Sequence, residues 1–290
     1  MTVNQQNADD MGPVSEGTGC GSQPMLEVSA LTVTFSGQTV LRNIDLTVPR
    51  GETVAVIGES GCGKTVLLKS MVGLVRPSKG KVVFDGQDLS RLDDHQLSKQ
   101  RIRMGFVFQN AALFDSMTIG QNIAFPLREH TNHRPARIRE QVHSVLAEVG
   151  LPEEVLKKKP AELSGGMRKR VGVARALVME PELVFYDEPT TGLDPIMSDV
   201  INELMLRTRH RYDVTSVIVT HDMRTARKVA DRVVMLYPTT RLDHDQPQVL
   251  FDGPPSQLDR TSDKRVAQFV RGEAGERLME LQQGRSGSDG

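Results

Sequence analysis

The feature that most constrains this chain is a glycine-rich segment, Gly58 to Thr65, with the sequence GESGCGKT. It follows the apolar run TVAVI and precedes TVLLKSMVGL, which is typical of a helix. A strand, a loop of this spacing and a helix together match the phosphate-loop pattern. Glycines allow such a loop to turn its backbone amides toward phosphate oxygens at a helix N-terminus. The segment predicts a site for nucleotide phosphates.

Every residue of this loop is a candidate nucleotide ligand. Lys64 is expected to meet the β and γ phosphates of ATP, and the Thr65 hydroxyl is expected to bind Mg²⁺. The full set of candidates is Gly58, Glu59, Ser60, Gly61, Cys62, Gly63, Lys64 and Thr65.

The runs ETVAVIG, MGFVFQ, ELVFYDE and TSVIVTH are short and mostly apolar, and helical stretches separate them. Runs of this kind fill a parallel sheet that is covered on both faces. Ahead of them, LEVSALTVTF and TVLRNIDLTV flank Ser36-Gly37-Gln38, as in an antiparallel hairpin. The predicted fold class is α/β, with a parallel-sheet core and an N-terminal antiparallel β-layer.

One domain is predicted over residues 25–271, because no internal repeat is visible. Residues 115–182 are predicted to form an inserted helical subdomain. Within it one helix face carries Ile138, Val142, Val145, Leu146 and Val149.

The ends of the chain are predicted to lie outside the fold. Residues 1–24 are rich in Gly, Ser, Gln and Asn, which predicts a disordered leader, and residues 272–290 are predicted to be a loose tail. After His221 we expect a helix over residues 223–230, a hairpin from DRVVMLY to QVLFDG, and a last helix that starts near Pro255.

Composition excludes several classes of function. A net charge of -1 gives no basic field, so nucleic acid is not an expected partner. Cys20 and Cys62 form neither a disulfide framework nor a metal-ligand spacing, which fits a reducing cytosol. No apolar run approaches the roughly 20 residues that span a bilayer. A membrane role would therefore come through a partner.

Two adjacent carboxylates, Asp187 and Glu188, end the apolar run LVFY. They are expected beside the phosphate loop if the two strands are sheet neighbours. Asp187 would hold Mg²⁺, directly or through water, and Glu188 would act as the general base that polarises the attacking water.

The stretch Leu163-Ser164-Gly165-Gly166-Met167 opens a helix and resembles LSGGQ, the signature of the ATP-binding cassette (ABC) family. The resemblance covers about residues 26–271. It implies that two copies pair head to tail, so that Ser164, Gly165 and Gly166 of one copy reach the nucleotide of the other. Met167 stands where the family usually has Gln, which leaves the Ser and Gly donors unchanged. The neighbouring Arg168, Lys169 and Arg170 are interpreted as a solvated helix face without a role.

Four further residues take their expected roles from this resemblance. Gln109 resembles the family glutamine that contacts Mg²⁺ or the lytic water, and His221 resembles the histidine that touches the γ-phosphate. Asp194, in Gly-Leu-Asp-Pro, resembles the loop that communicates across the pair. Phe35 lies where the family places a ring against adenine, although a half-buried strand Phe fits that position equally well.

Two stretches are similar to the ATPases of Mce-type and Mla-type lipid transport systems: KTVLLK from Lys64, and ALFDSMT from Ala112 with NIAFPLRE following it. The resemblance implies a peripheral ATPase on the cytoplasmic face of the inner or plasma membrane, with permease subunits and an Mce-domain lipid carrier as partners. The ATPase of an amino-acid or other small-solute importer is one alternative, and a soluble ABC protein that acts as a mechanical switch is another. The polar segment 238–248, PTTRLDHDQPQ, has no function that the sequence explains.

Overall fold

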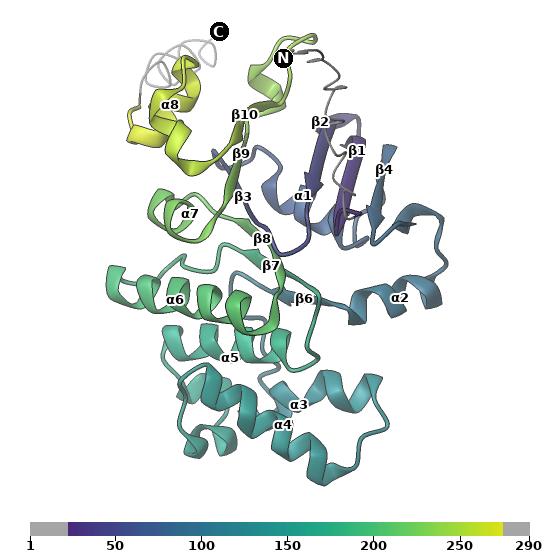
Figure 1. Ribbon diagram of the computed structural model, residues 1–290, viewed down its shortest axis with the longest axis vertical. Helices are drawn as coiled ribbons and strands as arrows, with labels where there is room; N and C mark the ends of the chain where they lie inside the picture. The colour runs from purple at the N-terminus through teal and green to yellow at the C-terminus, as the bar shows by residue number, and fades with distance from the viewer. Residues whose placement is uncertain (1–22, 275–290) are drawn as a thin grey trace, which may run out of the picture.

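Two β-sheets organise residues 23–274, the part of the chain that the computed structural model describes (Figure 1). The central sheet has the strand order β10-β9-β3-β8-β7-β6, and the smaller sheet has the order β2-β1-β4-β5. The predicted leader and tail lie outside the described residues, apart from residues 23–24 and 272–274.

The central sheet is parallel except at one edge. Its parallel strands are β3 (Thr53–Gly58), β6 (Met104–Val107), β7 (Leu183–Asp187), β8 (Thr215–Val219) and β9 (Arg232–Leu236), and β10 (Val249–Gly253) runs antiparallel to β9. Every residue of β3, β7 and β8 is buried. The apolar runs of the sequence are therefore the strands of a sheet covered on both faces.

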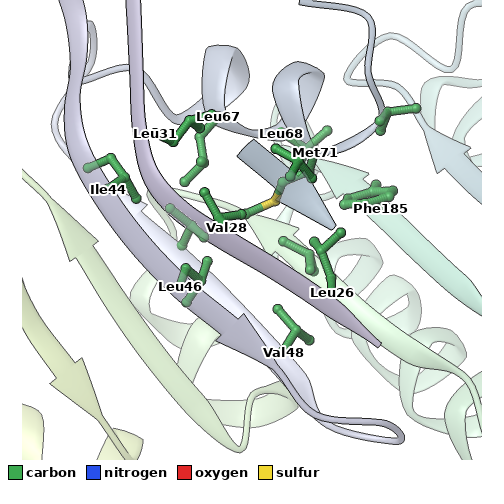
Figure 2. Packing of buried hydrophobic residues seen from close by; sticks show 14 of the residues in the cluster. Leu26, Val28, Leu31, Ile44, Leu46, Val48, Leu67, Leu68, Met71 and Phe185 are labelled. Atoms are coloured by element: carbon green, nitrogen blue, oxygen red, sulfur yellow. The ribbon is translucent and has the colours of Figure 1, made fainter. Parts of the chain in front are cut away.

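The smaller sheet is antiparallel and contains the predicted hairpin, β1 (Leu26–Phe35) and β2 (Gln38–Val48). Two strands that we did not predict, β4 (Lys79–Phe84) and β5 (Gln87–Asp88), extend it beyond β1. Its apolar side chains pack on α1 (Lys64–Met71), and Figure 2 shows Val28 and Leu31 of β1 near Leu67 and Leu68 of α1. This contact attaches the β-layer to the helix that follows the phosphate loop.

Helices inserted between β6 and β7 form the far end of the molecule in Figure 1. They are α3 (Ile119–His130), α4 (Pro135–Glu148) and α5 (Gly165–Leu177), with the short 3-10 helices η2 (Glu153–Lys157) and η3 (Pro160–Glu162) between α4 and α5. On the predicted face of α4, four of the five apolar side chains are buried, and Ile138 is partly buried against the same core. The α/β fold class with an inserted helical subdomain is confirmed.

The remaining helices lie around the two sheets. They are α2 (Asp94–Ile102), α6 (Pro195–Tyr212), α7 (Met223–Val229) and α8 (Lys264–Arg271), with η1 (Leu89–Arg91), η4 (Thr239–Arg241) and η5 (Pro255–Arg260). Of these, η1 lies against β4 and η4 against β2 of the smaller sheet. The last helix was predicted to start near Pro255, and this start was wrong. Residues 255–260 form a 3-10 helix, and the α-helix begins at Lys264, where the Asp263 carboxylate caps it by accepting from the Arg265 amide. Among residues 23–274, no helix combines the length and apolar character needed to cross a membrane.

Candidate nucleotide site

A cavity of about 860 Å³ opens over the carboxyl end of β3. The phosphate loop forms its floor. Gln109, Glu188 and His221, which follow β6, β7 and β8, line it as well. Tyr237, Arg241 and residues of α8 close a further side. The carboxyl ends of parallel strands are the usual place for a ligand in an open α/β sheet.

Three glycines of the phosphate loop, Gly58, Gly61 and Gly63, have a positive φ, and at Gly58 and Gly63 a Cβ atom would also collide with neighbouring atoms. Gly63 has a φ of 99° and directly precedes α1. Gly58 has a φ of 148°, and a Cβ atom there would lie 2.3 Å from the Leu236 carbonyl oxygen. The Lys64 ammonium is folded over the loop and donates to the carbonyls of Gly58 at 2.8 Å and Glu59 at 3.0 Å. The loop thus holds one cation beside the first amides of a helix, an arrangement suited to phosphate.

Asp187 reaches the loop although β3 and β7, the strands that precede the loop and carry Asp187, are not paired with each other. Strand β8 lies between β3 and β7, so the two strands are not neighbours. The contact forms because α1 crosses the ends of β8 and β7, which brings the Thr65 hydroxyl to donate to the Asp187 carboxylate at 3.2 Å. Burial raises the pKa of the Asp187 carboxyl, and the Thr65 hydrogen bond opposes that shift.

Glu188 directly follows β7 and turns its side chain toward the cavity. Its backbone has a positive φ of 50°, and its amide donates to the Val219 carbonyl of β8 at 2.9 Å. One carboxylate oxygen lies 2.8 Å from Nδ1 of His221 and accepts from the Thr191 hydroxyl at 3.0 Å. The side chain is largely buried, whereas His221 is more than half exposed. A fixed carboxylate at the cavity wall is the geometry that a general base requires.

Lys169 was wrongly interpreted as solvated. It is only 8% exposed, and its ammonium donates to the backbone carbonyl of Glu188 at 3.2 Å. Burial lowers the pKa of the Lys169 amine, and the charge of Glu188 opposes that shift. A helical projection would have found it, because Lys169 shares a face of α5 with the buried Gly166 and Val173.

The other two basic residues of that set are partly buried rather than fully solvated. Arg168 donates to the Leu163 carbonyl at 2.5 Å, and Arg170 donates to the Gly150 carbonyl at 2.8 Å. Both side chains therefore fix loops that enter and flank α5.

Gln109 and Phe35 have different positions relative to the cavity. Gln109, two residues beyond β6, lines it with an exposed amide. Phe35, at the end of β1, is 47% exposed and is not among the described residues that line the cavity, whereas Val40 of β2 is. The hairpin thus borders the site, and the adenine role of Phe35 stays a prediction.

The Ser164 loop lies away from this cavity, at the start of α5. The Ser164 hydroxyl accepts from the Met167 amide at 3.3 Å, as an N-cap does, and Ser164 and Gly165 are exposed. Gly166 packs against Met197 of α6, since a Cβ there would lie 2.7 Å from the Met197 methyl. Asp194 caps α6 in the same way, and the two helix N-termini therefore form one exposed surface.

The oxygen ligands present fit Mg²⁺ bound together with a nucleotide. Thr65 and Asp187 offer a hydroxyl and a carboxylate 3.2 Å apart, and Gln109 lines the same cavity. Within residues 23–274, no group of three or more His, Cys, Asp or Glu side chains could hold a metal ion by itself. Mg²⁺ is commonly bound by one or two carboxylates together with substrate phosphates, so this set suits it.

The fold and the site define an ATP-binding cassette, and the family profile described as ABC transporter matches residues 41–191. The chain belongs to this family.

The chain is also similar to individual proteins of this family and to solved structures. The chain is 39% identical to the intermembrane phospholipid transport system ATP-binding protein MlaF of Haemophilus influenzae over 87% of its own length and 92% of that protein. It is 40% identical to the probable ribonucleotide transport ATP-binding protein mkl of Mycobacterium tuberculosis over 85% of its length, and it spans 66% of that protein. It is similar to the cassette MJ0796 bound to ADP and Pi, with a TM-score of 0.69 and 31% identity over 74% of this chain and 97% of that one.

Proposed function

We propose that this chain is the ATP-hydrolysing subunit of a phospholipid transporter. The observation that carries the catalytic part is the position of Glu188, whose buried carboxylate is held by His221 and Thr191 in the cavity floored by the phosphate loop. The lipid part is supported by similarity to the MlaF proteins of Haemophilus influenzae and Escherichia coli. The mkl relatives are named as probable ribonucleotide transport proteins, so the identity of the cargo requires an experiment of its own.

In this mechanism the chain's own groups divide the work. The loop amides and Lys64 bind and orient the β and γ phosphates of ATP, and Glu188 accepts the proton of the attacking water. His221, 2.8 Å from Glu188, keeps that carboxylate in place and lines the cavity, where it would face the γ-phosphate. Thr65, Asp187 and Gln109 would hold Mg²⁺, which neutralises charge that develops on the phosphate oxygens.

The exposed surface of the Ser164 and Asp194 loops supports pairing of two copies. Ser164, Gly165 and Gly166 place hydrogen-bond donors at a helix N-terminus, yet they lie away from the chain's own phosphate loop. Pairing head to tail would set them on the partner's nucleotide, with Asp194 between the two sites. The dimeric structure of MJ0796, similar to this chain with a TM-score of 0.72 and 30% identity over 80% of this chain and 99% of that one, supports this arrangement.

A second hollow, of about 500 Å³, supports the assignment of a permease partner. It lies between α2, β6, α3 and α5, and its lining is rich in phenylalanine. Phe114 and Phe125 contact each other with ring centroids 4.9 Å apart, and Phe114 is 41% exposed. An exposed aromatic groove of this kind suits an apolar helix of a membrane subunit. The chain would then act at the cytoplasmic face of the inner or plasma membrane, with an Mce-domain protein as the lipid carrier.

Replacement of the proposed base tests the catalytic part. Glu188→Gln keeps an acceptor for Thr191 but removes the basic group, so we expect ATP hydrolysis to fall by about 10²–10⁴-fold with ATP affinity unchanged. Steady-state phosphate release and nucleotide titration measure the two quantities. Undiminished hydrolysis would refute the assignment.

Gentle extraction of the tagged protein from native membranes tests the transport part. Mass spectrometry should find a multi-spanning permease, an Mce-domain protein and bound phospholipid in the purified complex. A solute-binding protein in their place would favour a small-solute importer. Purely soluble partners would favour a switch protein without a transport role.

A further inference from the structure

The polar segment 238–248, which connects β9 to β10, contacts the phosphate loop and the antiparallel sheet at the same time. We propose that this segment, here called the strap, positions the phosphate loop for nucleotide binding, and that Gln248 and Arg241 are its positioning residues. The proposal rests on the phosphate-loop assignment made above. It assigns a role to a part of the chain that no sequence motif explains.

Gln248 joins three segments through one amide group. Its side chain is only 2% exposed, and its Nε2 donates to the carbonyls of Cys62 and Val40, each at 3.0 Å. Its Oε1 accepts from the Arg42 amide at 2.8 Å. Both donor hydrogens and the acceptor are therefore used, which leaves this buried amide one well-defined position. The phosphate loop is joined by it to strand β2.

The hydrogen bond from Gln248 to the Cys62 carbonyl affects the direction of a loop amide that would face phosphate. In a planar trans peptide the carbonyl and the following N–H point in opposite directions. Because the Cys62 carbonyl faces Gln248, the Gly63 amide points away from Gln248, and Gly63 lines the nucleotide cavity. Gln248 therefore sets the orientation of one amide of the phosphate loop from the outside.

Arg241 holds the other end of the loop. Its guanidinium donates from Nη1 to both carboxylate oxygens of Glu59, at 2.9 and 3.0 Å. The Glu59 carbonyl in turn accepts from the Lys64 ammonium at 3.0 Å. The guanidinium also lies 5.1 Å from the centroid of the Tyr237 ring, which restricts where it can move.

Further hydrogen bonds attach the strap to the antiparallel sheet. The Thr239 hydroxyl donates to the Thr39 carbonyl at 2.7 Å. The Arg42 guanidinium donates to the backbone carbonyls of Asp243 and Gln246 at 2.8 and 2.9 Å. The strap is thus fixed on the antiparallel sheet, which allows it to hold a loop whose glycines give the backbone conformational freedom.

Isothermal titration with ADP tests the proposal, because ADP reports on the loop of a single copy without hydrolysis. Gln248→Ala removes three hydrogen bonds, one to the phosphate loop at Cys62 and two to strand β2, so we expect the Kd for ADP to rise by about tenfold. In the ATPase assay KM should rise with kcat nearly retained, since the catalytic Glu188 is untouched. His244→Ala, in the same strap but with an exposed side chain, is the matched control and should leave both values unchanged.

A double-mutant cycle keeps the test valid if Gln248→Ala does not fold. Arg241→Ala and Glu59→Ala should each weaken ADP binding, and the double variant should be no weaker than the worse single variant. Arg241→Lys should restore part of the affinity. Additive effects, or an ADP affinity unchanged in Gln248→Ala, would overturn the strap's role. Normal ADP binding by Lys64→Ala would instead refute the phosphate-loop assignment itself, so the two failures are distinguishable.

Discussion

At the scale of residues, Asp187 and Glu188 show how neighbours in sequence acquire separate tasks. Asp187 is the last residue of β7 and faces Thr65, whereas the positive φ of Glu188 turns the next carboxylate toward His221. Two adjacent carboxylates on one surface would repel each other. The change of backbone conformation between them directs the two carboxylates to different partners, as the proposed roles of metal ligand and base require.

The raised pKa of Asp187 leads to a stability prediction. Above that pKa the buried carboxylate is charged and costs the folded state free energy, and the cost shrinks as pH falls through the raised pKa toward 3.8. Asp187→Asn keeps an acceptor for Thr65 and removes the charge. We expect the free energy of unfolding at neutral pH to rise by about 0.5–2 kcal/mol while Mg²⁺-dependent hydrolysis falls.

Urea denaturation over a series of pH values measures this difference. The advantage of Asp187→Asn over the natural chain should decrease as the pH is lowered. A variant less stable than the natural chain at neutral pH would contradict the prediction.

At the scale of elements, helix α5 connects the exposed Ser164 loop to the Glu188 side of the cavity. Its N-terminus carries Ser164, and one turn later Lys169 holds the Glu188 carbonyl. Eight of its thirteen residues are buried, which places it between the central sheet and helices α3 and α4. One apolar side of the helix, with Val171, Ala174 and Val178, is buried, and burial extends to other faces as well.

The close packing of α5 on β6 is tested at Gly105. A Cβ there would lie 2.8 Å from the Ala176 carbonyl oxygen of α5 and 3.1 Å from Pro181, so backbone would have to move. We expect Gly105→Ala to lower the free energy of unfolding by about 1–3 kcal/mol. Gly165→Ala is the matched control for stability, because its new methyl group has no neighbour closer than 4.0 Å. Equal thermal unfolding temperatures for the two variants would show that the contact is loose.

At the scale of the whole molecule, the proposed head-to-tail pair would complete each nucleotide site with residues from two separate surfaces of the cassette. The phosphate loop and Glu188 lie on one part of the surface, and the Ser164 and Asp194 loops lie on another. Next to Asp194, Ile196 is 77% exposed, which is unusual for a large apolar side chain at the start of a helix. This exposure is explained if a second copy covers it.

A charge at Ile196 tests pairing of the whole cassette. In the Glu188→Gln background, which slows hydrolysis, we expect Ile196→Glu to weaken ATP-dependent dimerisation by about tenfold or more, because a charge would be desolvated. Light scattering after size exclusion measures the dimer. Leu74→Glu, at another apolar side chain that is 52% exposed, serves as control. ADP binding should stay normal in both variants, and an unchanged dimer in Ile196→Glu would contradict the proposed interface.

Contiguous patterns were enough to predict the phosphate loop, the strands of the central sheet and the Ser164 helix start. Each depends on residues within one turn or one strand, where glycine conformation, apolar runs and helix capping act locally. Strand β4 escaped prediction because it is stabilised by pairing with β1, a partner far away in sequence, and β5 escaped it because it has only two residues, which pair with β4.

Only the tertiary structure decided which distant groups meet. The order of strands placed β8 between β3 and β7, so Asp187 reaches Thr65 through the position of α1 and not through strand pairing. Lys169 is buried because α5 is enclosed on several faces, and Gln248 bonds to Cys62 across 186 residues of chain. Such contacts depend on how layers pack, since burial and hydrogen bonding between remote segments leave no periodic pattern in the sequence.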